Sequence, residues 1–187
     1  GICRVVATQD FWGGELPTSW AKCRPDYIVV NDEIGAGIVL NAWPGFDREG
    51  VLVTGFPAMD KYAEYDAEGA ARSALQKLNL NGTQPIILYG GQGNCTSHAL
   101  QELVETLNDI GQKVVLIARP HPRMKNDFAH EYEPWQKALN SFRSGTLITD
   151  SSACDTSSLI AAATVTVSMY STMLVEASFV LQLTVAE

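Results

Sequence analysis

The residues best suited to chemistry lie in one short segment, Arg119-Pro120-His121-Pro122-Arg123. The arginines offer forked hydrogen-bond donors, His121 can donate or shuttle a proton, and the prolines fix the backbone between them. A phosphate or pyrophosphate group is the natural partner of such a loop. The alternative is a basic loop that pairs with nearby acids, namely Asp127, Glu131 and Glu133.

A glycine-rich loop, Gly90-Gly91-Gln92-Gly93, follows the apolar run Pro85–Tyr89. Gly90, Gly91 and Gly93 would let a ligand approach the backbone, and the helix predicted next would offer its N–H groups to an anion. The spacing is not GxGxxG, and Arg119 rather than an acidic residue ends the next strand, so a dinucleotide site is not indicated. The alternative is a tight strand-to-helix turn.

Two further polar segments follow predicted strands. Ser171 and Thr172 open a helix, where hydroxyl and N–H groups can bind phosphate oxygens, and Glu176 could accept hydrogen bonds from ribose hydroxyls. The segment 150–152 (Asp-Ser-Ser) could contact a base or a ribose. The alternatives are structural: Ser171 as a helix cap with Glu176 on the helix surface, and the 150–152 segment as a cap of the helix at Asp155.

These segments can form one site only in a fold that brings the ends of the strands together, and the pattern of the sequence predicts such a fold. Apolar, β-branched runs alternate with amphipathic helices, which is typical of βαβ units and predicts an α/β fold with a parallel sheet flanked by helices. In open parallel sheets, ligands bind beyond the carboxyl ends of the strands. The predicted strands are Cys3–Thr8, Tyr27–Asn31, Gly50–Thr54, Pro85–Tyr89, Lys113–Ala118, Thr146–Thr149, Thr164–Ser168 and Leu181–Val185. The predicted helices are Ile34–Trp43, Asp66–Leu78, Ser97–Ile110, Asp127–Phe142, Asp155–Ala163 and Ser171–Phe179.

Composition excludes several classes of protein. Of the 187 residues, 46% are hydrophobic and 18% are charged, which rules out a disordered chain. The net charge of −8 argues against binding to nucleic acid or anionic lipid. The four cysteines form no CxxC pair, so neither a zinc site nor a disulfide framework is indicated and a reducing cytoplasm is the simplest location. The uncharged stretch Leu159–Val175 fits a buried strand followed by a helix better than a membrane span.

The domain organisation is predicted from the changes in pattern along the chain. Residues 67–187 would form a nucleotide-binding domain that ends early, and residues 55–66, with a glycine-proline turn and a charged stretch, would be a linker. Residues 1–54 are too few for a complete second domain and would be the tail of an amino-terminal α/β domain. We therefore expect a fragment of a longer protein, whose exposed apolar surface could drive self-association.

The order of the Gly loop, the RPHPR segment and the S-T-x-x-x-E helix resembles the carboxy-terminal, Rossmann-like half of GT-B-fold glycosyltransferases. It is also similar to the sugar-nucleotide 2-epimerases and to the HP-motif transferases of the polysialyltransferase and CDP-glycerol glycerophosphotransferase types. Val53–Asp60 resembles their interdomain linker segment, with Phe56 in place of the usual Asn. The resemblance covers residues 50–187.

The resemblance implies a role for each candidate residue. Arg119, His121 and Arg123 would lie near the phosphates of a nucleotide-diphosphate donor, Ser171 and Thr172 would hold the diphosphate, and Glu176 would bind the ribose. Gly90, Gly91 and Gly93 would belong to the donor-binding residues and face the cleft between the domains. His121 would be a catalytic proton donor, and Asp10 is the one acidic candidate for a base in the amino-terminal part. No metal and no cofactor is implied, because the nucleotide sugar is a substrate.

The implied activity is transfer of a glycosyl or phospho-alditol group to a glycan or small-molecule acceptor in polysaccharide biosynthesis, in the cytoplasm or peripherally at the inner membrane face. A sugar-nucleotide 2-epimerase is one alternative, although the Gly-Gly pair found before the Glu in many of these enzymes is missing. A non-catalytic fragment that binds nucleotide is a second. A flavodoxin-like domain of unrelated function is a third.

Overall fold

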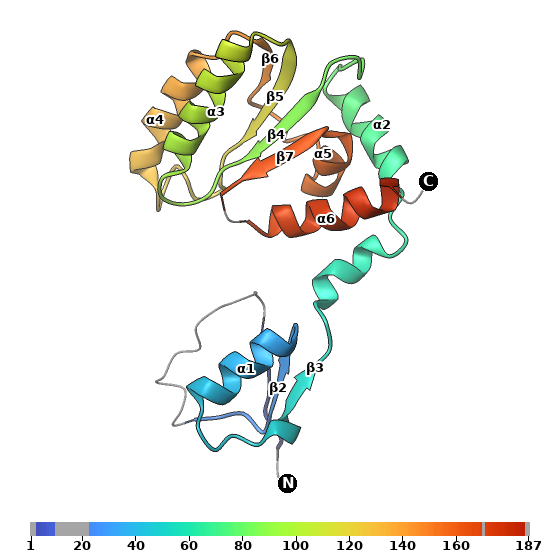
Figure 1. Ribbon diagram of the computed structural model, residues 1–187, viewed down its shortest axis with the longest axis vertical. Helices are drawn as coiled ribbons and strands as arrows, with labels where there is room; N and C mark the ends of the chain where they lie inside the picture. Colours follow the sequence, from blue (N-terminus) through green and yellow to red (C-terminus); the bar gives the residue numbers. More distant parts are fainter. Residues whose placement is uncertain (1–2, 10–22, 170, 186–187) are drawn as a thin grey trace. The chain divides into compact units, whose positions relative to one another are not determined.

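The computed structural model describes residues 3–9, 23–169 and 171–185. The chain divides into two compact units, Gly1–Ala63 and Glu64–Glu187 (Figure 1). The division falls within the 55–66 segment that the sequence analysis assigns to a linker. Each unit is described by itself.

The first unit is a three-stranded parallel sheet with one helix. Strands β1 (Val6–Thr8), β2 (Tyr27–Val30) and β3 (Val51–Val53) pair in that order. Helix α1 (Glu33–Ala42) connects β2 to β3, with a 3₁₀ turn at Arg48–Gly50 before β3 and a second at Pro57–Tyr62 after it. The buried core joins the helix to the sheet through Ile28, Val30, Ala36, Val39, Trp43 and Val51.

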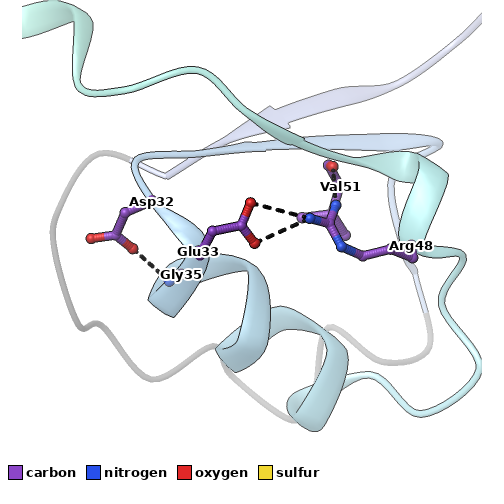
Figure 2. A network of polar contacts seen from close by, with 5 residues as sticks. All are labelled: Asp32, Glu33, Gly35, Arg48 and Val51. Atoms are coloured by element: carbon purple, nitrogen blue, oxygen red, sulfur yellow. Dashed lines mark hydrogen bonds and ion pairs between the residues drawn. The ribbon is translucent and has the colours of Figure 1, made fainter.

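Polar contacts fix the start of α1 in this unit (Figure 2). The Asp32 carboxylate caps the helix by accepting from the Gly35 N–H at 2.7 Å. The Arg48 guanidinium donates to Glu33, 3.2 Å from Oε2, and to the carbonyl oxygen of Val51 at 2.9 Å. Arg48 therefore ties the turn before β3 to the first turn of α1.

The second unit contains a four-stranded, fully parallel sheet with the strand order β6-β5-β4-β7. The strands are β4 (Ile86–Gly90), β5 (Val114–Arg119), β6 (Gly145–Ile148) and β7 (Val165–Ser168). The order runs outward from β4 to β6 and then returns to place β7 on the other side of β4. This is the doubly wound arrangement, in which ligands bind where the strand order reverses.

Helices cover both faces of this sheet (Figure 1). Helices α3 (Thr96–Ile110) and α4 (Ala129–Asn140) pack on one face. Helices α2 (Ala67–Lys77), α5 (Thr156–Ala162) and α6 (Thr172–Val185) pack together on the other. Helix α3 turns one apolar side to the sheet, and this side forms part of an almost fully buried core under α3 and α4. The buried residues of this core are Tyr89, Leu100, Val104, Leu116, Ala118, Met124, Trp135, Ala138 and Leu139.

The predicted α/β class and the alternation of elements are confirmed. One predicted element is wrong: Leu181–Val185 is not a strand, because α6 continues to Val185. The uncharged stretch from Leu159 divides among α5, β7 and α6, and no helix within the described ranges is long and apolar enough to cross a membrane.

Candidate functional site

The carboxyl ends of the central strands meet at one level in the second unit. Gly90 of β4 lies directly opposite Arg119 of β5 and Ser168 of β7. The Ser168 hydroxyl donates to the Gly90 carbonyl oxygen at 2.8 Å, and the Gly91 N–H donates to the Arg119 carbonyl oxygen at 2.8 Å. Two of the predicted segments, the glycine-rich loop and the start of RPHPR, are therefore brought together by the sheet.

His121 is held in one orientation beside this edge. Its Nδ1 accepts a hydrogen bond from the Arg123 N–H at 3.2 Å, and its ring packs in a T-shaped arrangement with the Phe128 ring, with the centroids 5.8 Å apart. Because Nδ1 is the acceptor, the neutral ring carries its proton on Nε2. His121 is half-buried, and its Nε2–H is a donor that could bind a phosphate oxygen.

The two arginines of the segment differ. Arg119 is half-buried, and its guanidinium donates to the carbonyl oxygen of Cys154 at 3.2 Å, which ties it to the loop after β6. Arg123 is exposed; it pairs with Asp127 at 3.0 Å and its Cζ lies 5.6 Å from the centre of the Phe128 ring. The alternative of a basic loop paired with a nearby acid thus holds for Arg123, through Asp127.

The glycines of the Gly90–Gly93 loop are needed for close packing. A Cβ at Gly90 would overlap the Cε atom of Met173, and one at Gly91 would lie 3.0 Å from the Trp135 ring. A Cβ at Gly93 would lie 3.1 Å from the Phe128 ring. Two N–H groups of this loop already have partners, because Gly91 donates to the Arg119 carbonyl oxygen and Gln92 donates to the Thr96 hydroxyl at 3.0 Å, as in the tight-turn alternative.

A buried carboxylate, missed in the sequence, occupies the start of α3. Glu131 of α4 is 6% exposed and accepts from the Cys95 N–H at 2.6 Å, the Ser97 N–H at 2.9 Å and the Ser97 hydroxyl. Burial alone would raise the pKa of Glu131. The hydrogen bonds from Ser97 and Cys95, with a smaller contribution from His130, outweigh burial and hold that pKa below its ordinary value. The prediction that the α3 N-terminus offers these groups to a ligand anion is therefore wrong.

The first turn of α6, like that of α3, contains no acidic residue of its own. Ser171 caps the helix, as the structural alternative proposed: its Oγ accepts from the Met173 N–H at 3.1 Å and its carbonyl oxygen accepts from the Leu174 N–H at 3.0 Å. Thr172 is the first residue of the helix, and the N–H groups of a first turn lack partners within the helix. Met173 brings this turn against Gly90.

The remaining candidates are Glu176, the 150–152 segment and Asp10. Glu176 is half-buried on α6, about one turn beyond Thr172. Asp150 accepts from Ser152, whose side-chain and backbone hydrogen bonds lower the Asp150 pKa, and Asp155 itself caps α5. Asp10 lies outside the described residues.

Phe128 and Met173 also escaped the sequence analysis. Both are apolar residues that touch loop glycines, Phe128 at Gly93 and Met173 at Gly90. An apolar residue just before a helix or in its first turn is a weak signal, because the same position often serves only the core. No group of three or more His, Cys, Asp or Glu side chains able to hold a metal ion is found in the described part of the chain.

Comparison with known proteins identifies the family. The model of the family described as CDP-glycerol:poly(glycerophosphate) glycerophosphotransferase matches residues 18–176. No curated protein matches the chain in sequence.

Two solved structures share the fold. The wall teichoic acid polymerase TagF, in a structure soaked with CDPG, is 19% identical with a TM-score of 0.53, and the match covers 87% of this chain and 38% of TagF. HepE of Anabaena, in complex with UDP and glucose, is 9% identical with a TM-score of 0.51, and the match covers 94% of this chain and 50% of HepE. The chain therefore spans half or less of the length of either protein. The predicted resemblance to GT-B-type transferases is confirmed, and the chain belongs to the CDP-glycerol:poly(glycerophosphate) glycerophosphotransferase family.

Proposed function

We propose that the second unit binds the donor of a transferase reaction, and that this donor is a cytidine-diphosphate-linked alditol such as CDP-glycerol or a related nucleotide-diphosphate sugar. The family description names CDP-glycerol, and the structure of TagF was soaked with CDPG. The transferred group would be glycerophosphate or a glycosyl group, and the acceptor a poly(glycerophosphate) chain or another glycan. The match to a glycerophosphotransferase family disfavours the 2-epimerase alternative.

The observation that carries this proposal is the contrast between two helix starts. In many nucleotide-binding sheets the helix after the first strand receives a phosphate. Here the corresponding helix, α3, already holds the Glu131 carboxylate of α4 on the N–H groups of Cys95 and Ser97. The N–H groups at the start of α6 that the structure pairs are instead capped by Ser171, a neutral residue, and Met173 of this turn packs against Gly90. We therefore propose that the donor phosphates bind between the α6 start and His121.

The proposed chemistry uses this edge as a set of hydrogen-bond donors. In glycerophosphate transfer an acceptor hydroxyl oxygen forms a bond to the β-phosphorus of the donor, and the bond from that phosphorus to the bridging oxygen breaks. CMP leaves with the bonding electrons. The Nε2–H of His121 and the guanidinium of Arg119 would stabilise the charge that develops on CMP. For the hydroxyl proton we retain Asp10 as the proposed base.

Further parts of the proposal concern the surroundings of the reaction. We propose that Arg123 reaches the donor by exchanging Asp127 for a phosphate, and that Glu176 binds the ribose. The donor is a substrate, so the reaction as proposed needs no resident cofactor. Cys3, Cys23, Cys95 and Cys154 are all free, which supports a cytoplasmic location.

The experiment is a calorimetric titration of CDP-glycerol, CMP, CDP, UDP and GDP into the chain and its variants. We expect the cytidine compounds to bind, and His121→Ala and Glu176→Ala each to weaken binding by roughly 10- to 100-fold, the equivalent of a lost charged hydrogen bond. The matched control is His98→Ala, an exposed histidine on α3. Failure of every nucleotide to bind the wild-type chain would contradict the proposal. Binding that neither variant weakens would place the nucleotide elsewhere.

A further inference from the structure

Phe128 lies at the meeting point of the parts that form the proposed donor edge. Its ring closes on the glycine-rich loop, because a Cβ at Gly93 would come within 3.1 Å of it. The same ring packs against the His121 imidazole in a T-shaped arrangement, at 5.8 Å between centroids, and its centroid lies 5.6 Å from the Arg123 guanidinium carbon. The position of Phe128 therefore affects both the loop after β4 and the loop after β5.

Glu131 is joined to Phe128 through the backbone at the start of α4. Its N–H donates to the Phe128 carbonyl oxygen at 2.9 Å, and Phe128 is the residue immediately before α4. Its carboxylate is anchored 34 residues away along the chain on the Ser97 N–H and on the neighbouring Cys95 N–H. One side chain thus joins the start of α4 to the start of α3.

This anchor is strong for a single side chain. Hydrogen bonds to a charged group exceed neutral ones in strength, and the N-terminus of a helix favours a negative charge. The depressed pKa of Glu131 agrees with a carboxylate that is charged at neutral pH. The nearby Glu133 on the same helix is exposed and provides a matched comparison.

We propose that Glu131 is a positioning residue for the donor site: through Phe128 it holds the His121 ring with Nδ1 on the Arg123 N–H and Nε2–H available to the donor phosphates. The part that concerns the donor rests on the proposed function. The part that concerns the geometry of His121 does not.

The first experiment measures His121 without any ligand. The ¹⁵N chemical shifts of the imidazole nitrogens report which nitrogen carries the proton. We expect a predominant Nε2–H tautomer in the wild-type chain and in Glu133→Gln, and a mixture of tautomers in Glu131→Gln and in Phe128→Leu. A folded Glu131→Gln chain whose His121 signals match the wild type would overturn the proposal.

The second experiment is a double-mutant cycle on nucleotide affinity, with CDP as the probe. Glu131→Gln should weaken CDP binding about tenfold in the wild-type background and should have no effect when His121 is already alanine, because the two residues act as one unit. A purely structural role for Glu131 would give the same weakening in both backgrounds, and that result would also overturn the proposal.

Two provisions keep the tests decisive. If Glu131→Gln does not fold, Ser97→Ala, which removes one of the three hydrogen bonds to the carboxylate, replaces it and should shift the His121 tautomers in the same direction. If the wild-type chain does not bind CDP, the proposed function fails, and the imidazole shifts alone decide whether Glu131 positions His121.

Discussion

Replacing Glu131 by glutamine should destabilise the second unit at neutral pH. The glutamine oxygen can accept one of the hydrogen bonds that the carboxylate accepts from Cys95 and Ser97, but its NH₂ group would face an N–H donor. A buried donor left without a partner costs about 1–3 kcal/mol, and the lost charge at the helix N-terminus costs roughly 0.3–2 kcal/mol more. The expected loss is therefore about 1–5 kcal/mol, a large part of the roughly 5–15 kcal/mol typical of a domain.

Urea unfolding followed by far-ultraviolet circular dichroism measures this loss. With a slope of about 2 kcal/mol per molar urea, the middle of the usual range, the midpoint should fall by about 0.5–2.5 M. The exposed Glu133→Gln should stay within about 0.5 kcal/mol of the wild type, as surface substitutions usually do. Equal midpoints for Glu131→Gln and Glu133→Gln would refute the reasoning.

Unfolding of the wild type and of Glu131→Gln at different pH values tests the charge of Glu131. Its pKa is lower in the folded chain than its ordinary value of 4.5, so its charge stabilises the fold fully above that value. The contribution is lost as the pH falls through the lowered folded value. Asp150 and Asp155 also have lowered pKa values and weaken every variant in acid, so the informative quantity is the difference between wild type and Glu131→Gln. That difference should narrow below about pH 4.5, and a constant difference down to pH 2 would show that the charge contributes nothing.

Three other substitutions separate tight packing from surface charge. Gly91→Ala should crowd the buried Trp135 ring, 3.0 Å from the added Cβ, and the His121 backbone nitrogen, 3.1 Å from it, costing about 1–3 kcal/mol in urea unfolding and weakening CDP binding in calorimetry; unchanged values for both would contradict the packing seen here. Gly145→Ala should cost at least about 1–3 kcal/mol in the same unfolding assay, because this glycine has a φ of +137° and a Cβ would overlap the neighbouring strand. Glu33→Gln should cost less than about 1 kcal/mol, because its ion pair with Arg48 is exposed on both sides, and a larger loss would mean that this network matters more than its exposure implies.

Much of the fold could be predicted because its signals are local. The apolar run that becomes β5 and the apolar positions Leu100, Val104 and Leu107 of α3 follow directly from residue spacing. The edge that gathers Gly90 and Arg119 follows from the rule that parallel strands end together. The last segment failed because a short apolar run cannot distinguish a strand from the continuation of a buried helix, which is what Leu181–Val185 is.

The candidate site was less predictable because its decisive contacts are distant in sequence. Nothing in the spacing of charges shows that Glu131, one acid among several near the RPHPR segment, would reach back to Ser97. The sequence predicts that the N–H groups at the start of the helix after the glycine-rich loop are free for a ligand. In the structure, the Glu131 carboxylate accepts hydrogen bonds from the Cys95 and Ser97 N–H groups there. Local pattern also leaves Phe128 and Met173 as ordinary apolar residues, and only the packing shows that they touch the glycines.

The most direct test of the donor site is a ¹H–¹⁵N NMR titration of the chain with CDP. The proposed site predicts that the amide signals of His121 and Thr172 move with increasing CDP, while those of Cys95 and Ser97 stay in place because Glu131 retains their N–H groups. Movement centred on Cys95 and Ser97, with His121 and Thr172 unaffected, would contradict it and would place the phosphates at the start of α3.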